Sequence, residues 1–450
     1  MKKLISSKLF LLALCCLLIL WLIQACMVQP IDHTPFQQSD YYQHTLQELE
    51  NSPPLIEEGG ELQVGWSKVN ITPPVGTPMA GYGKRKGLRY EEVHDSVWVR
   101  SFAFDNGQTQ AVVVTLDMLL APMSITAALE QEYAALGLKP EQVYLTATHT
   151  HTSFGGWGQK LVGWLMAGNQ DEELVRKTTA RIVESIRKAQ QNKQPARVGY
   201  GIAYAPELVR NRLTGAMSGR DTTLRFLKIE QTAGSTAVLA TFAAHPTILP
   251  SMDPVLSRDY PGELVDQLEE TVDFAAFAAG AVGSQAVEAP YGNTFESTQA
   301  VGRRLADAIE AELAAVQLSD TATIGFTRVP LELPDPEWRL STTYSFAPFL
   351  FNGLFGSYPA YISSLQLGET ILLGVPADYS GELLPVLEKQ ASQQGQQVIV
   401  TSFNGGYVGY ITPDKHYPLK KYETRDMNFY GPQSGGYFTD ILLRLLRLYR

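Results

Sequence analysis

The sequence predicts an α/β fold: a single large domain with a mixed β-sheet flanked by helices, preceded by an N-terminal membrane-anchor helix. Three observations predict it. From about residue 62, short runs of β-branched and aliphatic residues alternate with amphipathic segments of helical period. The 450 residues are 45% hydrophobic, enough for a sizeable core. An apolar run also occupies residues 9–28.

The N-terminal segment, residues 1–28, is predicted to be a signal anchor. Its apolar run is interrupted only by Gln24, and about 20 helical residues span the roughly 30 Å bilayer core. Lysines within the first eight residues would stay cytoplasmic, so the rest would be exported to the periplasmic or extracellular side. A cleaved signal peptide giving a secreted protein, a lipoprotein modified at Cys26, and a buried helix of the fold are the alternatives.

Residues 29–60 are polar and carry several prolines, which predicts a stalk or a loosely packed arm. The body, residues 61–450, is predicted to form one domain. Its clearest helix spans residues 171–191, where Val175, Ile182 and Ile186 share one stripe below an acidic first turn. Other helices are expected from about residue 124 and over 263–270 and 297–313, with strands over 111–116, 143–147, 223–229, 237–243, 370–374 and 397–401.

Composition excludes several classes of function. The formal net charge is −10, which argues against a nucleic-acid partner. The three cysteines all precede residue 27, so the body has no disulfide and no thiolate nucleophile. Any metal site in the body must therefore use His, Asp, Glu or Tyr.

Residues able to bind metal or move protons follow several predicted strands. In open α/β sheets, ligands bind beyond the carboxyl ends of strands, although ordinary polar loops begin there too. In an extended segment, residues i and i+2 point to the same side, so a His-Thr-His pair can address one pocket or form a simple surface pair. The candidates are Asp117, His149, His151, His245, Asp378 and Tyr410.

Six segments, in this order, resemble the neutral/alkaline ceramidase family along most of residues 64–433. No single segment is decisive, and the resemblance rests on all six in the family's order. The segments are Ala80-Gly81-Tyr82-Gly83 with Val93-His94-Asp95, Leu116-Asp117, Thr148-His149-Thr150-His151, Asn211-Arg212 with Asp221 to Phe226, Ala244-His245-Pro246-Thr247 with Ser257 to Gly262, and Asn404 to Tyr410 with Tyr422-Glu423.

The resemblance implies a zinc ion held by two histidines, a carboxylate and a tyrosine, which are here His149, His245, Asp378 and Tyr410. Asp378 follows Pro-Ala where the family has Pro-Gly-Glu, so the carboxylate is one methylene shorter. Aspartate is a competent zinc ligand. The alternative for Asp378 is a helix N-cap.

The resemblance also implies zinc-assisted cleavage of the amide bond of an N-acyl, ceramide-like lipid by activated water. His151 would then assist proton transfer, and Arg212 would stabilise the oxyanion. A surface turn is the alternative for Arg212. Two apolar stretches, residues 157–166 and 346–355, could line an acyl site or simply pack in the core.

One segment departs from the family. Where the well-known ceramidases carry a serine-asparagine pair, this chain has Gly280 and Ala281. A catalytically degenerate lipid-binding relative, or a hydrolase of another amide or ester, is therefore kept as an alternative. Ser284 faintly resembles a serine nucleophile, although the full elbow motif is absent.

Overall fold

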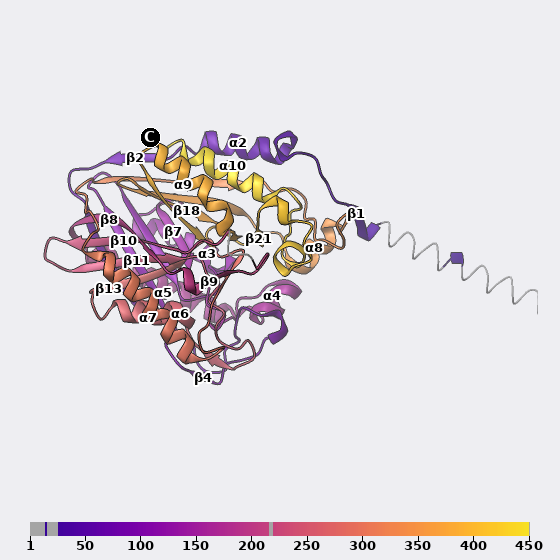
Figure 1. Cartoon of the computed structure of the whole chain (residues 1–450), viewed down its shortest axis with the longest axis horizontal. Coiled ribbons are helices and arrows are strands. Elements are labelled where there is room, and N and C mark those ends of the chain that lie inside the picture. Colours follow the sequence, from indigo (N-terminus) through magenta and orange to yellow (C-terminus); the bar gives the residue numbers. More distant parts are fainter. Residues whose placement is uncertain (1–13, 16–25, 216–218, 450) are drawn as a thin grey trace, which may run out of the picture.

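Two β-sheets pack face to face in the computed structural model, which describes residues 14–15, 26–215 and 219–449 (Figure 1). The α/β fold class predicted from the sequence is confirmed. The prediction of one mixed sheet is incomplete, because the strands divide between a large sheet and a smaller one.

The larger sheet has eight strands. Two of its pairings, β6 with β7 and β11 with β13, are parallel, and the others are antiparallel. Its two edge strands, β13 and β7, come into contact, so the sheet curls round on itself. In spatial order the strands are β13 (Phe274–Ala279), β11 (Thr236–Phe242), β10 (Thr223–Gln231), β8 (Gln194–Tyr204), β3 (Gln63–Asn70), β5 (Trp98–Asp105), β6 (Gln110–Leu116) and β7 (Val143–Ala147).

The smaller sheet has five strands, of which β18 and β20 are parallel neighbours. Side chains from both sheets, such as Phe102 and Phe326, share one buried cluster between them. Because every strand alternates its side chains between two faces, each sheet keeps a second apolar face for helices to cover. The strands are β2 (Leu55–Glu58), β15 (Thr323–Leu331), β17 (Ala360–Leu367), β18 (Thr370–Val375) and β20 (Gln397–Ser402).

Helices cover both outer faces (Figure 1). Helix α5 begins at its Asp171 cap, which accepts from the backbone N–H groups of Glu173 and Leu174. The eight-stranded sheet is covered by α3 (Met123–Glu130), α5 (Glu172–Gln191), α6 (Asp259–Leu268) and α7 (Phe295–Leu313). The five-stranded sheet is covered by α2 (Asp40–Asn51), α9 (Leu384–Gln393) and α10 (Ser434–Leu446).

Three strands that each have a parallel neighbour converge on one region at their carboxyl ends. Strands β7, β13 and β20 contact one another, although they come from different sheets. Just beyond these ends, the short parallel strands β19 (Asp378–Tyr379) and β21 (Tyr410–Ile411) place Asp378 directly opposite Tyr410. The smaller pairs are β12 (Val255–Leu256) with β4 (Glu92–Val93), and β14 (Gln285–Val287) with β9 (Val209–Asn211).

The prediction of a polar stalk over residues 29–60 is wrong for residues 36–58. Helix α2 packs against α10, and Tyr42 and Leu49 of α2, with Phe36 just before it, are buried in the same cluster as the outer face of the five-stranded sheet. Strand β2 then adds to the edge of that sheet. Burial of these apolar side chains outweighs the polar composition of the segment.

The predicted anchor, residues 1–28, lies outside the described residues except at 14–15 and 26–28. Within the described part of the chain, no helix has both the length and the apolar character needed to cross a membrane. At the end of this segment, strand β1 (Val28–Pro30) pairs with β16 (Tyr344–Phe346) beside helix α8 (Pro348–Phe355).

Candidate metal centre and cavity

His149 follows strand β7 and adopts a left-handed backbone conformation, with φ of 61°. This conformation is unusual outside glycine and costs free energy. The imidazole is held from two sides: Nδ1 lies 2.6 Å from the carbonyl oxygen of Leu119, and the ring stacks on Phe403 at 3.8 Å. Because the carbonyl can only accept, Nδ1 carries the proton and Nε2 presents a lone pair.

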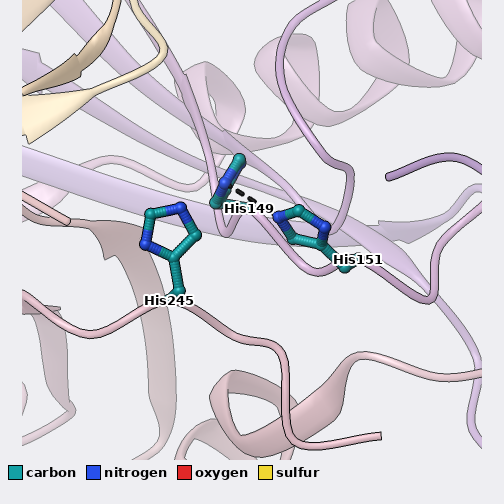
Figure 2. Close-up of side chains that lie close together, drawn as sticks. All are labelled: His149, His151 and His245. Carbon is teal, nitrogen blue, oxygen red and sulfur yellow. Dashed lines mark hydrogen bonds between the residues drawn. The ribbon is translucent and has the colours of Figure 1, made fainter. Parts of the chain in front are cut away.

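His245 and His151 are arranged in the same way. His245 Nδ1 lies 2.9 Å from the carbonyl oxygen of Val282, and His151 Nδ1 lies 3.0 Å from that of Gly81. Figure 2 shows the three imidazoles turned toward one another, and their ligand atoms lie within 4.8 Å of each other. The Nε2 atoms of His149 and His151 are only 3.0 Å apart.

Asp378 and Tyr410 complete the cluster. Asp378 Oδ1 lies 2.9 Å from His245 Nε2 and 3.5 Å from His149 Nε2. The Tyr410 hydroxyl lies 2.9 Å from His245 Nε2. The other carboxylate oxygen of Asp378 accepts a hydrogen bond of 2.7 Å from the Tyr407 hydroxyl. Asp378 is fully buried and belongs to strand β19, so it does not act as the helix N-cap considered from the sequence.

Arg212 brings a guanidinium to the same point. Its Nη2 donates to the Tyr410 hydroxyl at 2.8 Å and lies 3.3 Å from His245 Nε2. Its Nε pairs with Glu423 at 2.6 Å. The side chain is therefore directed into the site, which is incompatible with the surface turn considered from the sequence.

Burial controls the protonation of these groups. It lowers the pKa of His149 to about 3 and lowers the pKa values of His151 and His245 well below their ordinary range. Burial also raises the pKa of Asp378 and holds the pKa of Tyr410 well above its usual value. The three imidazoles are thus neutral, which is the form that binds a metal.

The arrangement fits a cation. With Nδ1 protonated on each ring, the contact between His149 Nε2 and His151 Nε2 joins two lone pairs, and so does the contact between His245 Nε2 and an ionised Asp378. Asp378 Oδ1 is buried and makes no well-formed hydrogen bond with a described residue. Such contacts are unfavourable unless positive charge lies among them. Nitrogen and oxygen donors oriented by backbone carbonyls are the usual surroundings of a protein-bound transition metal.

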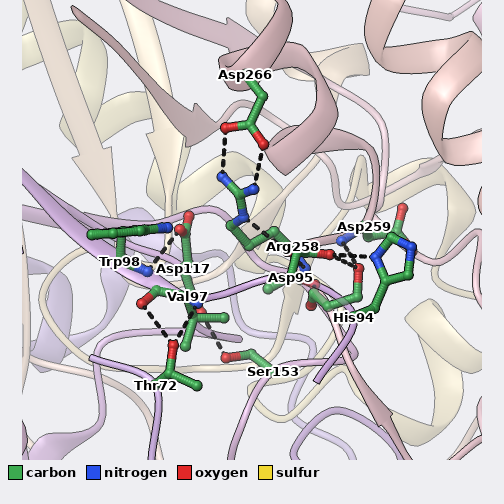
Figure 3. A network of polar contacts seen from close by, with 12 residues as sticks. Thr72, His94, Asp95, Val97, Trp98, Asp117, Ser153, Arg258, Asp259 and Asp266 are labelled. Atoms are coloured by element: carbon green, nitrogen blue, oxygen red, sulfur yellow. Dashed lines mark hydrogen bonds and ion pairs between the residues drawn. The ribbon is translucent and has the colours of Figure 1, made fainter. Parts of the chain in front are cut away.

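A second polar network holds the histidine loop in place (Figure 3). Arg258 pairs with Asp95 at 2.8 Å and with Asp266 at 2.5 Å. The carbonyl oxygen of Ser257 accepts hydrogen bonds from the Thr150 and Thr152 hydroxyls at 3.1 and 3.0 Å. The loops that carry Asp95 and His149 are therefore connected through the residues that begin helix α6.

Asp117 belongs to this network, and the structure does not bring its carboxylate to the metal cluster. Its Oδ2 accepts the backbone N–H of Trp98 at 2.9 Å, and its own carbonyl oxygen accepts from Ser153 (Figure 3). Burial raises the pKa of Asp117 to about 6. The hydrogen bonds to Trp98 and Ser153 therefore explain the position of Asp117 at the end of a strand.

The cluster of candidate metal ligands lines a cavity of about 480 Å³. The cavity lining joins His149, His151, His245, Arg212 and Asp378 to many apolar residues. Both apolar stretches predicted from the sequence contribute, through helix α4 (Lys160–Ala167) and helix α8. Their lining residues include Val162, Met166, Phe351 and Phe355. A volume of this size is typical of ligand sites in proteins.

The segment that departs from the family provides no serine nucleophile. The Ser284 hydroxyl is fully buried and shares a hydrogen bond of 2.6 Å with the Ser380 hydroxyl. A side chain at Gly280 would place Cβ 3.0 Å from the carbonyl oxygen of Phe242, which is a tight contact. The described structure therefore gives no support to a serine esterase.

Three groups that contact the site residues were not identified from the sequence. They are the hydroxyl of Tyr407, the carboxylate of Glu423 and the ring of Phe403, which contact Asp378, Arg212 and His149 respectively. Tyr407 and Glu423 do lie within the tyrosine-rich segments that carried the family resemblance. Their position beside Tyr410 was a signal that could have identified them. Phe403 has no comparable signal, since a single aromatic residue after a strand is common.

The fold and the buried cluster of histidines, Asp378 and Tyr410 define a mixed α/β protein with a candidate metal centre in the lining of a largely apolar cavity. Residues 62–289 match the profile of the family described as neutral/alkaline non-lysosomal ceramidase, N-terminal. The chain belongs to this family. The match includes His149, His151, Arg212 and His245, whereas Asp378 and Tyr410 follow it in the sequence.

Individual relatives support the family assignment. The neutral ceramidase of Pseudomonas aeruginosa is 22% identical over 465 residues, covering 82% of this chain and 69% of that protein. The neutral ceramidase of Mycobacterium tuberculosis is 24% identical over 223 residues, covering 45% of this chain and 34% of that protein.

Solved structures share the fold. The crystal structure of the Pseudomonas aeruginosa neutral ceramidase superimposes with a TM-score of 0.74 at 19% identity, covering 86% of this chain and 74% of that one. A ceramidase complexed with C2 gives a TM-score of 0.73 at 19% identity, covering 86% of this chain and 75% of that one.

Proposed function

We propose that this protein is a zinc-dependent amide hydrolase that cleaves the amide bond of an N-acyl, ceramide-like lipid. The observation that carries the proposal is the convergence of Nε2 of His149, Nε2 of His245 and Oδ1 of Asp378, with no hydrogen bond among these three atoms. Membership of the ceramidase family supports the reaction class. Zinc is favoured because two imidazoles, a carboxylate and a phenol oxygen are ligands that it accepts.

His149, His245, Asp378 and Tyr410 would hold the ion, and His151 would remain free for the substrate. Bound there, zinc supplies Lewis acidity that polarises a carbonyl group and makes water a stronger nucleophile at neutral pH. His151 is assigned to the chemistry because its ring packs against Tyr82, a residue that also lines the cavity.

The protein's own groups then account for the proton transfers. Water adds to the amide carbonyl, and His151 Nε2 takes the proton that the water loses. Arg212 donates to the developing oxyanion. The carbon–nitrogen bond breaks as His151 returns that proton to the leaving nitrogen, which gives a carboxylic acid and an amine. His151 is suited to this role because its neutral ring is fixed by the carbonyl oxygen of Gly81.

The cavity supports an amphiphilic substrate. Its base carries the polar cluster, and its walls carry aromatic and aliphatic side chains together with Met123, Met166 and Met427. Thioether side chains adapt to chains of varied shape, and apolar walls bind acyl groups by removing them from water. The amide would lie at the base and the acyl chain along the walls.

The N-terminal apolar run would retain the protein at a membrane, with the body on the periplasmic or extracellular side. Carbonate extraction of the native membranes tests retention: an anchored chain stays in the pellet. Mass measurement of the mature N-terminus separates the anchor from a cleaved, secreted form and from a lipoprotein modified at Cys26.

The function is tested on the full chain by measuring bound metal and hydrolysis of a panel of N-acyl lipids. The parent is expected to carry about one zinc per chain and to release free acid. His149→Ala and His245→Ala are expected to lose both. His44→Ala is the matched control, because His44 is exposed on helix α2, away from the cluster and from the network that holds the histidine loop. Metal and turnover retained in both cluster variants would overturn the assignment.

A parent that binds zinc but cleaves no amide or ester would identify the catalytically degenerate lipid-binding relative. This alternative is kept because Gly280 occupies the position of the family serine. Cleavage of esters or of short amides alone would instead indicate a hydrolase with a different substrate.

A further inference from the structure

Helices α4 and α8 are apolar in composition yet poorly buried. Only Ala167 of α4 and Phe351 of α8 are fully buried. Leu161 and Phe349 leave 50% and 59% of their surface exposed. Helices of a globular protein normally turn their apolar residues inward, and α4 and α8 depart from that pattern.

The two helices contact each other and both line the cavity. In each, one stripe faces the cavity: Val162 with Met166 in α4, and Phe351 with Phe355 in α8. Leu161 and Phe349 do not line the cavity. Each helix therefore presents apolar side chains both to the cavity and to the outside of the protein, and exposed apolar patches are a feature of surfaces that bind an apolar partner.

The charged residues in the segments around these helices are all basic. The segment that contains 3-10 helix η2 (Gly83–Arg85) packs against α4 and presents exposed Lys84 and Lys86, and Lys160 is exposed at the start of α4. Residues 81–88, 157–168 and 340–360 contain no Asp or Glu. These segments therefore carry no carboxylate, although the whole chain has a net charge of −10.

The chain also enters the domain on this face. The carbonyl oxygen of Met27 accepts from the backbone N–H of Ala347, and β1 pairs with β16 immediately before α8. Figure 1 shows β1, α8 and α4 on the same side of the molecule. Residues 26–28, which end the apolar run, thus join the fold beside the exposed apolar helices.

We infer that the outer faces of α4 and α8 are a membrane-docking surface that rests on a phospholipid bilayer. Leu161 and Phe349 enter the interfacial region, where apolar side chains gain by leaving water. Lys84, Lys86 and Lys160 lie against the headgroup phosphates. The cavity then opens toward the bilayer, so an amphiphilic substrate can pass into it without crossing water.

Docking is tested with the full chain reconstituted in vesicles of phosphatidylcholine whose acyl chains are brominated. Phe349→Trp places a fluorescent ring on the proposed surface, and bromine quenches a ring that reaches the acyl region. The matched control is Val386→Trp on α9, a position that is 43% exposed on the outer face of the five-stranded sheet. The added fluorescence of Phe349→Trp is expected to be quenched about twofold more than that of the control. Equal quenching would overturn the proposal.

A second measurement follows the passage of substrate and rests on the proposed function. Leu161→Asp combined with Phe349→Asp is expected to slow hydrolysis of a bilayer-embedded N-acyl lipid about tenfold, because charge is costly at that depth. Cleavage of a water-soluble short-chain substrate by the same proteoliposomes should not change, as for Val386→Asp. Equal losses on both substrates would overturn the docking role. If the parent protein cleaves neither substrate, the proposed function is contradicted. The quenching experiment still tests docking, because it does not depend on hydrolysis.

Discussion

Removal of one hydroxyl group, in Tyr407→Phe, is expected to weaken zinc binding without removing a ligand. The Tyr407 hydroxyl donates to Oδ2 of Asp378 at 2.7 Å and so leaves Oδ1 directed toward His245. A hydrogen bond to a charged group contributes about 1.5–3 kcal/mol. Loss of an outer partner of this kind typically lowers metal affinity about 10- to 100-fold, and we expect a change in that range.

The assay is a zinc titration against a chelator of known affinity at one fixed pH. Tyr379→Phe is the matched control, because Tyr379 is the residue that follows Asp378. The Tyr379 hydroxyl lies 2.9 Å from the Thr439 hydroxyl and makes no contact with the Asp378 carboxylate. The control should lose some stability and keep its zinc affinity. If Tyr407→Phe binds zinc as tightly as the parent, or if both variants weaken equally, the positioning of Asp378 by Tyr407 is wrong.

Three further outcomes are expected. Burial raises the pKa of Asp117 to about 6 from 3.8, so between these values the native state holds more protons than the unfolded chain and stability falls as pH rises. Asp117→Asn should remove this pH dependence of the free energy of unfolding. Above about pH 6 the variant should be more stable than the parent by about 2–3 kcal/mol, as measured by denaturant titration. An unchanged pH dependence would show that Asp117 is not its source. Arg212→Ala leaves buried Glu423 unpaired and should cost about 3 kcal/mol. Adding Glu423→Gln should restore most of that stability while turnover stays about 100-fold low; recovered turnover would remove Arg212 from the chemistry. Gly280→Ala places Cβ 3.0 Å from the Phe242 carbonyl oxygen and should cost about 1–3 kcal/mol, and an unchanged melting temperature would show that the site has room for the family serine.

The fold class could be predicted because the parallel strands carry local signals. Strands β6, β18 and β20 are dense in Val, Ile and Leu, and α5 has a clear cap and stripe. Strands β8 and β17 mix Gly, Ser and Gln among their apolar residues and were not predicted. The division into two sheets depends on pairings between strands far apart in the chain, which no local pattern contains.

The stalk prediction failed for an identifiable reason. Residues 29–60 are polar overall, but Ser39 caps α2, and Tyr42, Thr45 and Leu49 fall on one helical face. This stripe was present in the sequence and was outweighed by composition. Its burial against α10 is the tertiary contact that decides the outcome.

The candidate site was predictable where the family resemblance named a residue. His149, His151, His245, Asp378 and Tyr410 do come together. The groups that orient them could not be found in that way, because most are backbone carbonyl oxygens, such as those of Leu119, Gly81 and Val282. Carbonyl oxygens belong to every residue, so their role depends on the fold alone.

Anomalous X-ray scattering at the zinc absorption edge, measured on crystals of the full chain, locates the bound ion itself. We expect a single strong peak within about 2.0–2.3 Å of Nε2 of His149, Nε2 of His245 and a carboxylate oxygen of Asp378. A protein without such a peak after exposure to zinc, or with the peak away from these two imidazoles, would contradict the proposed zinc site.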